Sequence, residues 1–200
     1  MAIEMPIWIY WFICGLATAL ILINQQSIPK LLSPVLNSSQ RQQGYSLALT
    51  LGWVATLFAA LGYILLTHKE VAGSYQIQDL LVFSLLNGTL EQLMFIFWFL
   101  LGCWLAFRWS IQATWKIFGL GFLSYSLYSG AIHAFFWVKV LPAHQPALVI
   151  PVVLFFMSLA WMWLFWRYCA LGAIIGMHVA LDFLAVGHLH FAWFEPYQLF

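Results

Sequence analysis

Four ionisable side chains lie well inside the long apolar stretches of this sequence. They are Glu91, His133, His178 and Asp182. An ionisable group within such a stretch costs a few kcal/mol to place in hydrocarbon, so its presence points to a function. A carboxylate beside two imidazoles can activate a water molecule as a general base, and a further acid or imidazole can orient the oxyanion that forms. These four residues therefore predict hydrolytic chemistry at membrane depth.

The spacing of these residues places them in short polar stripes. His178 and Asp182 are four positions apart, and Asn87 precedes Glu91 by the same interval. Residues at i and i+4 lie on one face of a helix, one turn apart. Each stripe can therefore face the interior of a helical bundle, where a stripe on another helix, carrying His133, can meet it.

A structural role is the alternative for each of these groups. His178 and Asp182 can pair with each other as polar contacts between membrane helices. His133 is close enough to the membrane surface to be hydrated there. Glu91 is harder to explain in this way, because a carboxylate about 16 Å below the surface needs a partner or a proton. Taken together, the residues favour a functional site.

The composition indicates an integral membrane protein. Of the 200 residues, 64% are hydrophobic and 6% are charged, and the mean hydropathy is +0.93. A water-soluble domain of this composition would expose large apolar patches, so the expected environment is a lipid bilayer. The net charge of +1 and the lack of a basic cluster argue against nucleic acid as a partner. The three cysteines are too far apart for a recognisable disulfide framework or zinc site.

Six apolar runs are long enough to cross a bilayer as helices, which takes about 20 residues each. They lie at 6–24, 45–67, 80–107, 116–137, 146–166 and 169–188. The third run is longer than one crossing needs, which leaves open a tilted helix, a break at Asn87-Gly88, or two shorter helices. The first run lacks a basic leader, and we expect it to be a retained span. We predict an all-α, polytopic helical bundle in which 1–200 form a single transmembrane domain.

The basic residues of the connecting segments predict the orientation of this multi-pass protein. Five Lys and Arg residues fall in the first, third and fifth loops, against two in the second and fourth. By the positive-inside rule, the odd loops lie in the cytoplasm and both termini are non-cytoplasmic. Glu91, His133, His178 and Asp182 then all fall in the outer half of the bilayer, where three spans can direct them into one cavity.

Residues 80–200 resemble the CPBP family of intramembrane proteases, which is named for CAAX processing and bacteriocin processing and is also called the Abi family. The family pattern is EExxxR on one span, FxxxH on a later span and HxxxN or HxxxD on the last. The third motif is present here in GMHVALDF, which supplies His178 and Asp182. Residues 1–79 lie outside the resemblance and form an N-terminal two-span extension.

The other two motifs depart from the family pattern. In YSGAIHAFF, His133 is kept but Ser129 stands where the aromatic residue belongs. In NGTLEQLMFIFWF, Glu91 is kept as the leading glutamate, but Gln92 replaces the second glutamate and Ile96 replaces the arginine. These changes remove an acid and a cation from the expected site.

The resemblance implies an intramembrane peptidase that acts on a membrane-embedded or prenylated peptide or protein substrate. It implies that Glu91 and His133 activate a water molecule, and that His178 with Asp182 stabilises the oxyanion. Some family members have been described as metalloproteases, which leaves zinc as a candidate cofactor bound by Glu91, His133 and His178. The sequence has no HExxH signature that would favour zinc independently.

Two other functions stay open besides the leading prediction of a peptidase. A chain that kept the family scaffold but lost proteolysis would bind or help assemble another membrane protein complex, and the changed first motif favours this alternative. A haem held between helices by His133 and His178 is chemically possible. The haem would leave Glu91 and Asp182 without a role.

Overall fold

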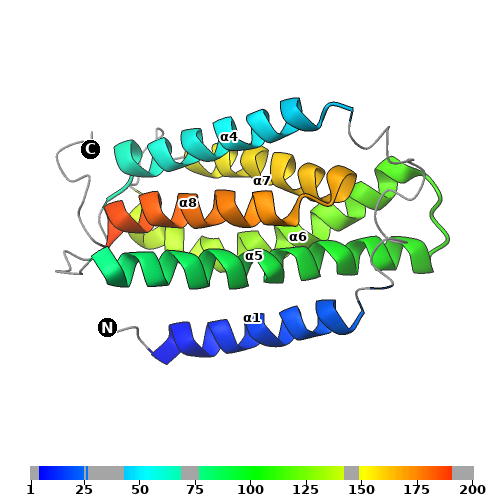
Figure 1. Cartoon of the computed structure of the whole chain (residues 1–200), viewed down its shortest axis with the longest axis horizontal. Coiled ribbons are helices and arrows are strands. Elements are labelled where there is room, and N and C mark those ends of the chain that lie inside the picture. Colours follow the sequence, from blue (N-terminus) through cyan, green and yellow to red (C-terminus); the bar gives the residue numbers. More distant parts are fainter. Residues whose placement is uncertain (1–4, 25, 27–42, 69–76, 142–148, 191–200) are drawn as a thin grey trace.

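The computed structural model describes residues 5–24, 26, 43–68, 77–141 and 149–190, and within them the chain forms six helices and no strand. The helices are α1 (Met5–Ile23), α4 (Tyr45–Leu66), α5 (Ile77–Arg108), α6 (Thr114–Val140), α7 (Val149–Tyr168) and α8 (Leu171–Leu189). They run roughly side by side along the long axis of the molecule (Figure 1). The predicted all-α helical bundle is confirmed.

Four helices in the described part of the chain are long and apolar enough to cross a membrane. They are α4, α5, α7 and α8, and α1 contributes a shorter apolar segment. Large apolar side chains such as Phe12, Leu127 and Phe156 are exposed on the outside of the bundle, as expected for helices that face hydrocarbon. The chain is an integral membrane protein, as predicted, whereas the side on which its termini lie stays a prediction.

Helix α5 is the central element of the bundle. It is one uninterrupted helix of 32 residues, about 48 Å long at the usual rise per residue. The predicted alternatives of a break at Asn87-Gly88 or of two shorter helices are therefore not realised. α5 packs against α1, α6 and α8, while α4 packs against α7 and α8 (Figure 1).

Gly88 sets the close approach of α5 to α8. A Cβ atom at position 88 would lie 2.8 Å from both the backbone nitrogen and the Cα atom of Val179. Small residues at such crossings let the backbones of membrane helices approach closely. Because Asn87 precedes Gly88 and His178 precedes Val179, this crossing brings the polar residues of the two helices together.

The buried apolar residues form two separate clusters. The larger cluster contains residues of α4, α5, α6, α7 and α8 and includes fully buried side chains such as Phe99 and Trp161. The smaller one consists of Cys14, Ala17 and Met94 and attaches α1 to α5. α1 is therefore held on the side of the bundle through its own small contact surface.

Candidate functional site

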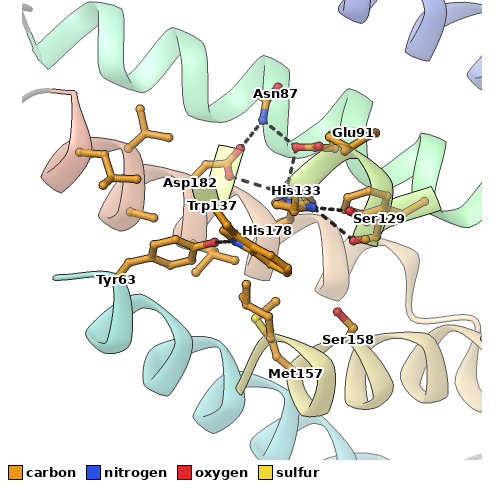
Figure 2. A pocket seen from close by; sticks show the side chains of 18 of the residues that line it. Tyr63, Asn87, Glu91, Ser129, His133, Trp137, Met157, Ser158, His178 and Asp182 are labelled. Atoms are coloured by element: carbon orange, nitrogen blue, oxygen red, sulfur yellow. Dashed lines mark hydrogen bonds and ion pairs between the residues drawn. The ribbon is translucent and has the colours of Figure 1, made fainter. Parts of the chain in front are cut away.

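A cavity of about 620 Å³ lies between the helices, and all six of them contribute to its walls. Glu91, His133, His178 and Asp182 all line this cavity (Figure 2). α5 supplies the first residue, α6 the second and α8 the last two. The four residues singled out in the sequence thus share one cavity.

Glu91, His178 and Asp182 form a compact group on one side of the cavity. The Nε2 atom of His178 lies 3.6 Å from Oε2 of Glu91 and 3.6 Å from Oδ1 of Asp182. The three residues are only 7%, 4% and 8% exposed, respectively. Two carboxylates and one imidazole therefore meet at a single buried point, which is where charge is most costly and interactions are strongest.

Asn87 fixes the two carboxylates relative to each other. Its Nδ2 atom donates hydrogen bonds of 2.9 Å to Oε2 of Glu91 and of 2.9 Å to Oδ2 of Asp182. Its Oδ1 atom accepts a hydrogen bond of 2.9 Å from Nε1 of Trp11. The indole nitrogen can only donate, so this contact sets the orientation of the Asn87 amide. Both amide N–H groups are then directed at the carboxylates.

Gln92 orients the His178 ring from the other side. Oε1 of Gln92 lies 3.0 Å from Nδ1 of His178, and this amide oxygen can only accept. Nδ1 is therefore the protonated ring nitrogen, and in the neutral ring Nε2 presents its lone pair to the two carboxylates. The ring is also stacked on Phe95 at 5.6 Å and packs against Trp161 at 5.3 Å between ring centroids.

Helix α1 contributes to the site directly. The hydroxyl group of Tyr10 donates a hydrogen bond of 2.9 Å to Oε1 of Glu91. Together with Trp11, which donates to Asn87, Tyr10 makes α1 a support for the polar residues of α5. The sequence pattern did not identify Tyr10 or Trp11, because nothing in the spacing of an apolar run relates position 10 to position 91.

His133 lies on the same cavity but outside the compact group. Its Nδ1 atom is 2.8 Å from the backbone oxygen of Ser129, to which it donates, so that Nε2 is left as an acceptor. Its ring packs near Phe95, with the ring centroids 6.2 Å apart. It also packs near Trp137, with the centroids 5.5 Å apart (Figure 2). Residues of α6 therefore hold this imidazole on the cavity wall, outside the set of Glu91, His178 and Asp182.

The residues best placed to hold a metal ion differ from those implied by the resemblance. In the described ranges, the potential ligand atoms that lie within 4.8 Å of one another belong to Glu91, His178 and Asp182. His133 is not in this set, although it was expected with Glu91 and His178. Asp182 takes its place because it lies one turn from His178 on the face that meets α5.

No protein-family model, curated protein or solved structure matches this chain. The chemistry of the cavity and the short motifs are therefore the basis of the proposed function.

Proposed function

We propose that the chain is an intramembrane peptidase of the CPBP type, which hydrolyses a peptide bond of a membrane-embedded or prenylated substrate. One observation carries this proposal: two carboxylates and an imidazole meet at a buried point on a cavity whose wall also holds His133. Peptide hydrolysis needs a proton acceptor for water and polar groups for the developing oxyanion, in a space shielded from lipid. The cavity offers residue types suited to each requirement.

Glu91 is the proposed proton acceptor. Tyr10 and Asn87 hold its carboxylate in one orientation, which suits a general base that must be positioned before the reaction. As the water oxygen bonds to the substrate carbonyl carbon, one water proton passes to Glu91. When the C–N bond breaks, that proton passes to the leaving amine. His178 and Asp182 are the proposed stabilisers of the tetrahedral intermediate, a role in which a proton carried by Nε2 of His178 or by the Asp182 carboxyl group is donated to the oxyanion.

The size and lining of the cavity agree with a substrate that arrives from the bilayer. A volume of about 620 Å³ is in the range of about 300–1,000 Å³ typical of small-molecule sites. It can hold a short extended peptide or a prenyl group but not a helix. Apolar residues such as Phe83 and Leu154 line it beside the polar ones, so a largely apolar segment would be accepted.

An assembly or scaffold function is the second candidate, and the hydrogen bonds around Asn87 favour it. The bonds from Tyr10, Trp11 and Asn87 join α1, α5 and α8, as expected of polar residues that hold membrane helices together. A protein with this role would bind another membrane protein complex without cleaving a peptide.

Cleavage of defined substrates separates the two candidates. We would reconstitute the wild type and Glu91→Gln in liposomes with a library of membrane peptides that includes a prenylated peptide, and identify products by mass spectrometry. We expect cleavage by the wild type and a loss of at least about 100-fold in Glu91→Gln, the usual scale for removal of a general base.

Asp79→Asn is the matched control, because Asp79 is a half-buried acid on the same cavity but at the start of α5. This variant should cleave like the wild type. Equal cleavage by the wild type and Glu91→Gln would reject the proposal. A lack of cleavage across the library would also reject it. If a wild type that cleaves no peptide co-purifies with one membrane protein, that result would support the scaffold function.

A further inference from the structure

The compact group presents three electron-pair donors to one point. They are Nε2 of His178, Oε2 of Glu91 and Oδ1 of Asp182, with the nitrogen 3.6 Å from each oxygen. Because Nδ1 of His178 carries the ring proton toward Gln92, no N–H of the neutral ring points at the carboxylates. Three acceptors that face one another in this way repel unless a proton or a metal cation lies between them.

The charge of the group points to a divalent cation. Among the residues that the structure describes, neither carboxylate pairs with a lysine or an arginine, and the basic partner of both is His178. With a neutral imidazole and both carboxyl groups ionised, as metal ligands are, the group carries a charge of −2 at a buried position. A single dication would neutralise this charge, and a buried charge is otherwise costly in a membrane protein.

The surrounding residues form the outer support that metal ligands usually have. A metal-binding histidine generally donates its other ring N–H to an oxygen atom, and ligating carboxylates accept further hydrogen bonds. Gln92 provides the oxygen for His178, and Asn87 donates to both carboxylates. Tyr10 donates to the second oxygen of Glu91. Each of the three donors is therefore already oriented toward the common point.

We propose that Glu91, His178 and Asp182 bind one divalent transition-metal ion of the zinc class. One imidazole and two carboxylates form a mixed nitrogen and oxygen set that suits such ions. Ligands of a tetrahedral zinc ion lie roughly 3.3 Å apart. The two separations from Nε2 of His178 are 3.6 Å, and the ligand atoms of all three residues lie within 4.8 Å of one another, so the group need only contract to bind the ion. The three protein ligands leave a position open for a water molecule.

This inference uses the site of the proposed function but does not depend on peptide cleavage. It also assigns a ligand set different from the one implied by the resemblance, with Asp182 in place of His133. When bound, the ion would supply Lewis-acid activation of a water molecule. The residues of this chain hold and orient the ligands.

Metal binding can be measured on the purified full-length protein. We would purify it in detergent with an affinity tag that contains no histidine, remove metals with a chelator, and add zinc chloride. We expect one Zn²⁺ per chain by mass spectrometry after gel filtration, and a higher melting temperature with zinc. Asp182→Asn should weaken zinc binding at least about 100-fold, and Gln92→Ala about 10- to 100-fold.

His133→Ala is the decisive comparison, because this residue lies on the same cavity but outside the ligand set. It should bind zinc with the affinity of the wild type, and so should Asp79→Asn. Loss of the ion in His133→Ala with retention in Asp182→Asn would overturn the assignment, as would a wild type that binds no zinc.

X-ray absorption of the wild type with zinc or cobalt tests the ligands without relying on the folding of any variant. We expect one imidazole and otherwise oxygen ligands, and two imidazoles would contradict the proposal. The two proposals can also fail separately. A wild type that cleaves peptides but binds no zinc would reject the metal site and leave the peptidase proposal standing. A wild type that binds zinc but cleaves no peptide would reject the peptidase proposal and leave the metal site standing.

Discussion

Asn87 holds the two carboxylates of the cavity at a fixed separation, and it does so with one side chain. A hydrogen bond to an ionised group contributes about 1.5–3 kcal/mol, and its loss leaves a buried acceptor without its donor. Asn87 donates two such bonds, to Glu91 and to Asp182. The relative positions of the Glu91 and Asp182 carboxylates therefore depend on the side-chain amide of Asn87.

Replacement of Asn87 by alanine should destabilise the protein and disorder the group. We expect Asn87→Ala to lower the melting temperature in detergent by several degrees, on the scale of about 2–4 °C per kcal/mol for a chain of this size. Asn24→Ala is the matched control, because Asn24 is exposed and, within the described residues, its side chain bonds locally to the backbone of Leu20. An equal melting temperature for Asn87→Ala and the wild type would show that the carboxylates do not need this donor.

At the residue level, the sequence was informative about the acids and imidazoles but not about their partners. Glu91, His178 and Asp182 stand out because charge is rare in apolar runs, and their helical spacing indicates a common face. In the sequence Gln92 stands out only as a departure from a motif, although in the structure it orients His178. Tyr10 gave no signal, because tyrosine is common in membrane helices and its role depends on which helix packs beside it.

At the level of the elements, the crossing of α5 and α8 determines whether the site exists. The two helices approach at Gly88 and Val179, one residue away from Asn87 and His178. The Gly88 position was predicted as a possible break in the third apolar run. In the structure Gly88 has a different role. Because it has no side chain, the backbone of α5 can contact that of α8, and α5 continues through this position without a break.

A methyl group at position 88 should separate the two helices. We expect Gly88→Ala to lower the melting temperature and weaken both peptide cleavage and zinc binding, because backbone atoms of Val179 lie 2.8 Å from the added Cβ and cannot rotate away. Gly176→Ala on α8 is the control, since nothing lies within 4 Å of a Cβ there. That variant should be as stable as the wild type or slightly more so, because alanine favours a helix over glycine by about 1 kcal/mol. Similar behaviour of the two variants would contradict the role assigned to the crossing.

At the level of the whole molecule, the positions of the helices followed closely from hydropathy. No end of the six predicted runs differs from the observed helix by more than three residues. A chain in hydrocarbon must satisfy its backbone hydrogen bonds within each segment, so a long apolar run has few alternatives to a helix. The order in which helices pack has no such constraint, and the contact of α1 with α5 through Tyr10 and Cys14 could not be read from the sequence.

The cavity reaches one end of the bundle. Asp79, which lies near the start of α5, and His190, just after α8, both line it. The turn between α7 and α8 lies at the opposite end (Figure 1). Cys169 in that turn is exposed, whereas Cys14 and Cys103 are buried. The two ends of the bundle can therefore be labelled separately through Asp79→Cys and the native Cys169.

The predicted orientation assigns these two ends to opposite sides of the membrane. Arg167 next to the turn contributes to the basic loops expected in the cytoplasm, so Asp79 should face the other side. With a membrane-impermeant maleimide, the double variant Asp79→Cys, Cys169→Ser should be labelled in intact cells, whereas the wild type should be labelled at Cys169 only after permeabilisation. The reverse pattern would place the mouth of the cavity on the cytoplasmic side and overturn the orientation. Labelling of both positions from the same side would contradict the crossing of the membrane between Asp79 and Cys169.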